Sequence, residues 1–134
     1  MVDTVWPFVA RMLDRAIPKE PLAFFTIEDV REDLERTDTV LWVAAHNDKI
    51  IAAFVTSLVV YKSVRSIKNV RSIKAYLMAG DDLHAWAAPF FETMKRHAKK
   101  NGCTVLEGCG RRGWTKIYPG LIDTGPVRLA MAIQ

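Results

Sequence analysis

The sequence predicts one domain, residues 1–134, of the α/β class with an α+β mixed sheet, in the element order α-α-β-β-β-α-β-α-β. Two helix-patterned segments open the chain, three β-rich segments follow, and a long amphipathic helix then precedes another strand. Neighbouring β segments joined by short turns pair antiparallel, whereas strand, helix and strand in succession form a parallel crossover. We therefore expect both kinds of pairing in one sheet, with the long helix 82–101 packed on it.

Two amphipathic helices are predicted in the first 36 residues. In residues 5–16 apolar side chains recur at helical spacing, and Pro7 falls in the first turn, where proline is tolerated. The second helix, residues 27–36, begins after Thr26, a preferred N-cap residue. Asp29 stands three positions after this cap and completes an imperfect capping box.

A hairpin is predicted next. Residues 39–45 and 50–60 are rich in β-branched and aromatic side chains, and the tight turn 46–49 separates them. The pentapeptide Val-Arg-Ser-Ile-Lys then occurs twice, at 64–68 and 70–74. We interpret the first copy as a basic loop or strand end, and the second as the start of a strand over residues 70–78.

The long helix 82–101 has the clearest pattern in the chain. Asp81 or Asp82 caps it, Pro89 should kink its first half, and Asn101-Gly102 ends it. Its apolar stripe consists of Leu83, Trp86, Ala87, Phe90, Phe91, Met94 and Ala98. Beyond the helix, we expect a strand at 103–106, a short helix at 112–118 and a half-buried final strand at 127–133.

Composition narrows the function classes. Half of the residues are apolar and a quarter are charged, which is typical of a globular domain. No apolar run reaches the roughly 20 residues of a membrane span, and no signal-peptide pattern opens the chain. Cys103 and Cys109 are too few for a disulfide framework or a zinc site. We expect a cytoplasmic protein with reduced cysteines, no metal and no membrane partner.

The net charge of +4 indicates either solvated basic faces or a phosphate-bearing partner. The basic residues gather at 62–74, 95–100 and 111–112. A nucleic acid would be bound through such charges, but the sequence contains no zinc finger, RNA-binding aromatic motif or helix-turn-helix signature. Nucleic-acid binding is therefore kept as an alternative and not as the main expectation.

The most informative segment is 76–83, in which an apolar strand ends at Gly80 and leads into the long helix. Free backbone N–H groups and the positive end of the helix dipole converge at such a junction, which makes it an anion site. With the long helix after the third strand and a short helix before the last, the chain resembles the GCN5-related N-acetyltransferase (GNAT) fold. The resemblance covers nearly the whole chain as an element order, not as a motif.

The resemblance implies that acetyl-coenzyme A is the cofactor. Its pantetheine arm would pair with the strand, and its pyrophosphate would rest on the turn. The implied positions are Leu77, Met78, Ala79, Gly80, Asp81, Asp82 and Leu83. If the turn holds the pyrophosphate, Gly80→Glu should abolish binding with little unfolding. Arg71 and Lys74 could contact the phosphates, or equally a nucleic-acid backbone. The turn departs from the family pattern, because it has one glycine and two carboxylates that would repel a pyrophosphate.

Two residues are candidates for proton transfer. Glu107 follows the strand 103–106 and could act as a general base, or it could be a solvated strand-end carboxylate. Tyr118 stands two residues before Gly120, an approximate match to the family's tyrosine that protonates the leaving thiolate, or it packs before a proline turn.

The leading hypothesis is an N-acyltransferase that moves the acetyl group to an unidentified amine, of a small molecule or a protein, within a ternary complex. The alternative is a catalytically inactive GNAT-like structural or partner-binding protein. Residues 110–114, Gly-Arg-Arg-Gly-Trp, are similar to small GNAT-like proteins of phage genomes. The sequence does not determine the oligomeric state, and a homodimer is compatible with it.

Overall fold

The computed structural model describes residues 2–17, 25–62, 69–80 and 83–108. The order α-α-β-β-β-α-β agrees with the expected one over these residues, and the segments 112–118 and 127–133 lie outside them. The elements are α1 (Val2–Ala16), α2 (Ile27–Asp33), β1 (Thr39–His46), β2 (Lys49–Lys62), β3 (Asn69–Gly80), α3 (Leu83–Lys100) and β4 (Val105–Gly108).

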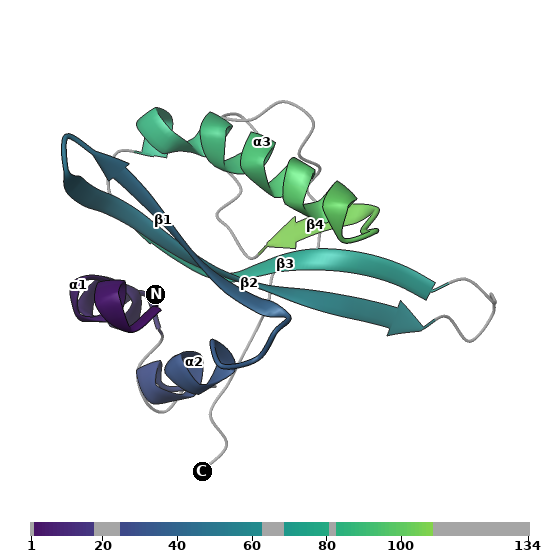
Figure 1. Ribbon diagram of the computed structural model, residues 1–134, viewed down its shortest axis with the longest axis horizontal. Helices are drawn as coiled ribbons and strands as arrows, with labels where there is room; N and C mark the ends of the chain where they lie inside the picture. Colours follow the sequence, from purple (N-terminus) through teal and green to yellow (C-terminus); the bar gives the residue numbers. More distant parts are fainter. Residues whose placement is uncertain (1, 18–24, 63–68, 81–82, 109–134) are drawn as a thin grey trace, which may run out of the picture.

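One mixed sheet organises the described residues, with the strand order β1-β2-β3-β4. The first two pairings are antiparallel and the β3–β4 pairing is parallel, which confirms the predicted mixed sheet. Asn47 and Asp48 have φ values of 51° and 61°, as a tight hairpin turn requires. Figure 1 shows α3 on one face of the sheet and α1 and α2 on the other.

The α3 face is closed by an aromatic core. Phe54 of β2 packs between Trp86 and Phe90, with ring centroids 5.0 and 4.1 Å away. Met94, one turn further along α3, is fully buried beside them. α3 continues through Pro89 as a single helix. These contacts confirm that the described part of the apolar stripe, from Trp86 to Ala98, faces the sheet.

The opposite face is closed by α1 and α2. Val9 and Leu13 of α1 and Val30 of α2 are fully buried against Val55 of β2. The two helices are also tied together by an ion pair between Asp3 and Arg31. The sheet therefore lies between two separate apolar layers.

Several predicted boundaries differ in the structure; the second helix, for example, ends at Asp33 and not at residue 36. The contacts give a reason for two further differences. α1 begins at Val2, so Pro7 lies in its second turn, not in its first. The last strand begins at Val105 and not at Cys103, because residues 101–103 close the end of α3. There the Cys103 N–H donates to the Ala98 carbonyl (2.8 Å), and Gly102 has φ +69°, which together form a helix-ending motif.

A bulge interrupts β3 at Tyr76. Val55 pairs with Leu77 and the next residue, Thr56, pairs with Ala75, so Tyr76 has no partner in this ladder. Ala75 packs in the core under α3, whereas Leu77 packs with α1 and α2. Residues two apart in a regular strand share a face, and the extra residue accounts for the change.

The part of the chain that the structure describes contains no helix long and apolar enough to cross a membrane. Within that same part, no cluster of three or more His, Cys, Asp or Glu side chains is arranged to hold a metal ion.

Candidate functional site

In the described part of the chain, the parallel pairing between β3 and β4 covers only the first half of β3. It runs from Ser72 opposite Val105 to Ala75 opposite Gly108, and β3 then continues for five residues to Gly80. Among the described residues, no strand pairs with this last part of β3 on the side away from β2. The bulge at Tyr76 falls where the pairing stops. Within the described residues, the backbone edge of β3 is therefore open over residues 76–80.

This open edge leads directly to the N-terminus of α3. Gly80 is the last residue of β3 and Leu83 is the first residue of α3, so two positions separate them. The first N–H groups of a helix have no partners inside the helix and lie at the positive end of its dipole. The structure thus places residues 77–80 directly before the start of α3, with two residues between them. Asp81 and Asp82 of the predicted turn lie outside the described residues.

Gly80 has a structural reason to be glycine. A Cβ there would lie 2.5 Å from the Cβ of Ala52 and 2.6 Å from the carbonyl oxygen of Ile51, both in β2. Its φ of +151° is also one that side chains rarely adopt. The expectation that Gly80→Glu would cause little unfolding was therefore wrong, since any side chain at this position forces β2 and β3 apart.

Glu107 lies on β4 and is held by a buried hydroxyl. The Ser72 Oγ donates a hydrogen bond of 2.7 Å to Glu107 Oε2, and Ser72 is fully buried. Lys74 is opposite Glu107 in the strand register. Because Ile73 packs under α3, alternation along the strand puts Ser72 and Lys74 on the sheet face that carries α1 and α2.

A row of polar side chains, one from each strand, crosses the sheet through Lys74 and Glu107. Ser57 of β2 pairs with Lys74, and its hydroxyl is 3.2 Å from that of Thr39 in β1. The row therefore runs from Thr39 through Ser57 and Lys74 to Glu107, one strand at a time. This row provides hydrogen-bonding groups at one end of the sheet face. The other end of the same face is covered by the apolar layer of α1 and α2.

Tyr76 opens the predicted segment 76–83, but the sequence analysis gave its side chain no role. Its hydroxyl donates to Asp33 Oδ2 of α2 at 3.3 Å, and its ring contacts the edge of Phe25, with centroids 5.8 Å apart. Burial and the nearby Asp33 carboxylate raise the pKa of Tyr76, so the phenol stays protonated at neutral pH. Only the bulge places it beside the open edge, and no sequence pattern indicates that bulge.

The remaining candidates do not gather at the turn. Arg71 lies nine positions before Gly80 and donates hydrogen bonds of 3.3 and 3.4 Å to the Asn101 carbonyl at the far end of α3. Lys74 lies six positions before Gly80, beside Glu107. Tyr118 lies outside the described residues.

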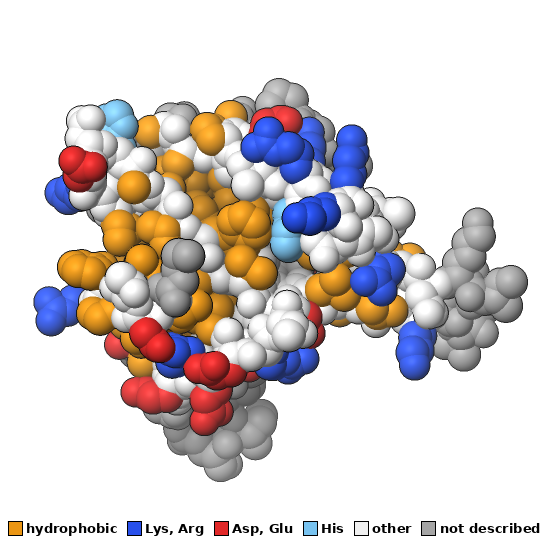
Figure 2. All heavy atoms as spheres, viewed as in Figure 1, with side chains coloured by type: hydrophobic (Ala, Val, Ile, Leu, Met, Phe, Trp, Pro, Cys, Tyr) orange, Lys and Arg blue, Asp and Glu red, His pale blue; other side chains and the backbone are white. Residues whose placement is uncertain are grey.

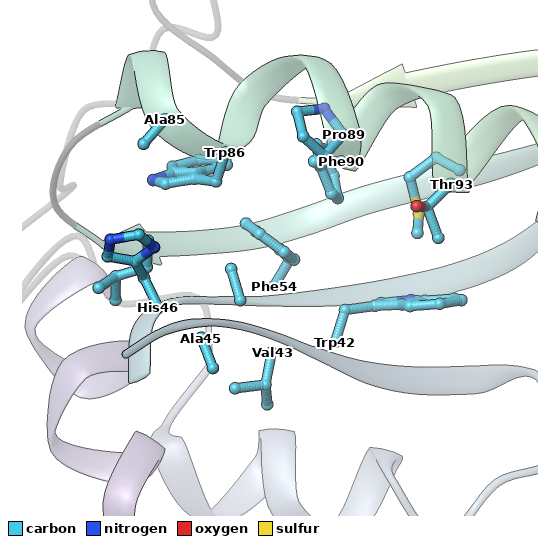
Figure 3. A pocket seen from close by; sticks show the side chains of 13 residues that line it. Trp42, Val43, Ala45, His46, Phe54, Ala85, Trp86, Pro89, Phe90 and Thr93 are labelled. Atoms are coloured by element: carbon cyan, nitrogen blue, oxygen red, sulfur yellow. The ribbon is translucent and has the colours of Figure 1, made fainter. Parts of the chain in front are cut away.

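An apolar hollow of about 300 Å³ lies between α3 and the β1–β2 hairpin. Figure 3 shows Trp86 and Phe90 of α3 facing Phe54, with Trp42 and His46 along the rim that β1 forms. Trp86, which belongs to the predicted apolar stripe, is buried, and Trp42 is half-buried. The Trp42 indole donates to Thr56 Oγ1 at 2.9 Å.

No protein-family model matches this sequence, and no curated protein matches it. Solved structures do match over nearly the whole chain. A predicted acetyltransferase from Clostridium acetobutylicum, solved with acetyl-CoA, has a TM-score of 0.70 at 14% identity and covers 95% of this chain and 90% of its own.

The aminoglycoside N-acetyltransferase AAC(6')-Iy, solved in complex with CoA, has a TM-score of 0.71 at 14% identity, covering 98% of this chain and 91% of its own. A mutant of the BH1408 protein from Bacillus halodurans has a TM-score of 0.72 at 11% identity, covering 97% and 95%. At these identities the likeness establishes the fold.

Proposed function

We propose that this chain, which has the GNAT fold, binds acetyl-coenzyme A and transfers its acetyl group to an amine. The observation that carries the proposal is the edge of β3 over residues 76–80, which no other described strand covers and which precedes the N-terminus of α3 by two positions. Two proteins of the same fold have been solved with acetyl-CoA or CoA, which supports this choice of ligand.

The open edge suits an extended ligand arm that carries amide groups. Five residues at a rise of about 3.3 Å offer roughly 16 Å of backbone to such an arm. In the proposed complex the pyrophosphate lies over the turn 80–83, at the positive end of α3. The thioester then lies near Tyr76 and Leu77, and a backbone N–H of the bulged segment can donate to the oxyanion that forms there.

The chemistry requires a neutral amine. The amine nitrogen attacks the thioester carbonyl, the C–N bond forms, the C–S bond breaks, and the nitrogen gives up one proton. We assign the acceptance of that proton, directly or through water, to Glu107, whose carboxylate Ser72 orients. The leaving thiolate takes a proton from Tyr118 or from water.

In this proposal the basic residues of β3 do not contact the coenzyme phosphates. Arg71 supports the end of α3, and Lys74 lies beside Glu107 in the adjacent strand. We therefore assign the phosphate contacts to the turn and not to these two residues.

Calorimetric titration of acetyl-CoA into the protein tests for a coenzyme site. The same titration with the variant Asp81→Asn tests whether the turn binds the pyrophosphate. Removing a carboxylate from the turn should tighten binding several-fold, since like charges repel less when one is removed. Asn also keeps the local hydrogen-bonding capacity of the turn. Glu32→Gln on α2, where the residue is exposed, removes the same charge elsewhere and should change the affinity much less.

Equal effects of the two substitutions would reject the turn as the pyrophosphate site. Absence of binding at millimolar acetyl-CoA would reject the coenzyme proposal and favour the inactive GNAT-like protein. If binding is present, Glu107→Gln should lower kcat by about 10²–10⁴-fold on any accepted amine while leaving the coenzyme affinity unchanged. Release of free thiol reports the rate.

A further inference from the structure

Lys74 lies beside the proposed proton acceptor, and the acetyl-transfer proposal gives its side chain no role. Its Cα is the register partner of the Glu107 Cα across the parallel β3–β4 pair. Neighbouring strands lie about 4.8 Å apart, and residues paired across them present their side chains on the same face of the sheet. The amine of Lys74 and the carboxylate of Glu107 are therefore neighbours on the face that carries α1 and α2.

Glu107 is held at one of its two carboxylate oxygens. Oε2 accepts the 2.7 Å hydrogen bond from Ser72, which is fully buried and lies two positions before Lys74. Among the described residues, no hydrogen bond reaches the other oxygen, Oε1. The buried hydroxyl thus orients the carboxylate, and Oε1 remains available to accept a proton.

The ammonium group of Lys74 is not held by an acidic partner. No ion pair or hydrogen bond in the described part of the chain includes this side chain, which is half-buried. A lysine side chain is a flexible four-carbon stem with a compact charge at its end. The nitrogen can therefore turn from Glu107 toward the edge of β3.

The position proposed for the thioester is two residues further along the same strand. Two residues of β-strand span about 7 Å, which separates Lys74 from Tyr76. Tyr76 packs with the apolar layer of α1 and α2, so the two side chains lie on one face. The described β3–β4 pairing ends between them, at Ala75. Lys74 thus presents an amine between the proposed base and the proposed thioester.

We propose that Lys74 is itself an acetyl acceptor, and that the chain acetylates its own Lys74 Nζ. Glu107 takes one proton from the ammonium group. The neutral nitrogen attacks the thioester carbonyl, the C–N bond forms and the C–S bond breaks. The second proton that the nitrogen loses goes to the leaving thiolate, so the products are an acetylated lysine and free coenzyme thiol. This self-acetylation rests on the proposed coenzyme site, and it names one amine that the site can reach.

Exposed lysines provide an internal comparison. Figure 2 shows Lys and Arg side chains gathered on the surface over the C-terminal half of α3 and toward the end of the β2–β3 hairpin. Lys62 of β2 and Lys99 of α3 are exposed, whereas Lys74 is half-buried. A reagent that needs no coenzyme site, such as acetic anhydride, should therefore modify Lys62 and Lys99 before Lys74. A reaction directed by the proposed site should reverse that order.

Incubation of the purified chain with acetyl-CoA, followed by peptide mass spectrometry, tests the proposal. Lys74 should gain one acetyl group at least about tenfold faster than Lys62 or Lys99, because its amine and the thioester are held in one molecule. For the same reason, the rate per molecule at saturating acetyl-CoA should not depend on protein concentration. Parallel treatment with acetic anhydride should give the opposite order of reactivity.

Glu107→Gln should slow the acetylation of Lys74 by about 10²-fold or more and leave the slow background at Lys62 and Lys99 unchanged. Glu32→Gln, which removes an exposed carboxylate of α2, is the matched control and should leave all three rates unchanged. The same order of reactivity with both reagents, or an unchanged Lys74 rate in Glu107→Gln, would overturn the proposal.

Failure of self-acetylation can be told apart from failure of the coenzyme site. Calorimetric binding of acetyl-CoA, together with thiol release in the presence of an added amine but no acetyl group on Lys74, would reject self-acetylation alone. Absence of binding at millimolar acetyl-CoA would reject both proposals.

Discussion

Trp42 shows how one side chain can hold several elements of this molecule together. Its indole N–H donates to Thr56, which is 1% exposed, and its ring meets the His97 ring edge-on at a centroid distance of 5.0 Å. A buried N–H needs a partner, and Thr56 supplies it across the β1–β2 pair. The ring thus links β1, β2 and α3, and it holds the rim of the apolar hollow in place.

His97 should make stability depend on pH. Partial burial, and secondarily the positive charge of Lys100, lowers the pKa of His97 below its ordinary value of 6.5. The unfolded chain then binds more protons than the folded one between the two pKa values, so stability is full above pH 6.5 and falls as the pH drops through that window. Thermal unfolding of His97→Gln should show a flatter dependence of Tm on pH below 6.5.

His46→Gln is the control for this experiment, because His46 is exposed at the end of β1. It should retain the acid-side slope of the native protein. If the native slope persists in His97→Gln, another group must be responsible for it.

At the scale of elements, the sequence predicts that β3 is a strand, but it predicts neither the bulge in β3 nor the register in which β3 pairs with β4. The hydrophobic periods predicted the hairpin and the long helix correctly, because each of these elements contains its own pattern over many residues. The bulge at Tyr76 changes the count by one residue and leaves the composition the same, so no period reveals it. The contact between Ser72 and Glu107 depends on the parallel register of two strands 35 positions apart, which local patterns do not specify.

Substitution of Gly80 tests whether β2 approaches the end of β3 too closely for any side chain. Gly80→Ala should lower the free energy of unfolding by about 1–3 kcal/mol, because the new Cβ collides with β2 and the backbone φ is unfavourable for alanine. Chemical denaturation measures the change. Gly108→Ala is the matched control, since a Cβ there meets its nearest atom, the Ala75 carbonyl oxygen, at an ordinary 3.4 Å. Equal losses for the two variants would contradict the assignment of strain to Gly80.

At the scale of the whole molecule, one sheet separates two apolar layers. Leu13 is fully buried in the α1 and α2 layer, and Ile73, 1% exposed, is buried in the α3 layer. The sheet is shared, so loss of either layer exposes one face of the same four strands. We therefore expect one cooperative unfolding transition, as most single domains of this size show.

The two layers should nevertheless contribute independently to stability. Leu13→Ala should cost about 2–5 kcal/mol and Ile73→Val about 0.5–1.5 kcal/mol, by loss of buried methyl and methylene groups. In the double variant the losses should add within about 0.5 kcal/mol, because the two side chains belong to different clusters. Guanidinium titrations of all four proteins measure this. Two separate transitions, or strong non-additivity, would show that the layers do not form one unit of this kind.

The unpaired Tyr76 also shows what a single extra residue contributes to a strand. If that single codon were deleted, Ala75 would adjoin Leu77, and both residues would keep the faces and the β2 partners that they have now. The deletion would, however, remove the Tyr76 ring from the apolar layer of α1 and α2, together with its edge contact with Phe25 and its hydrogen bond to Asp33. The extra residue thus adds one more link between β3 and that layer without moving its neighbours from their faces.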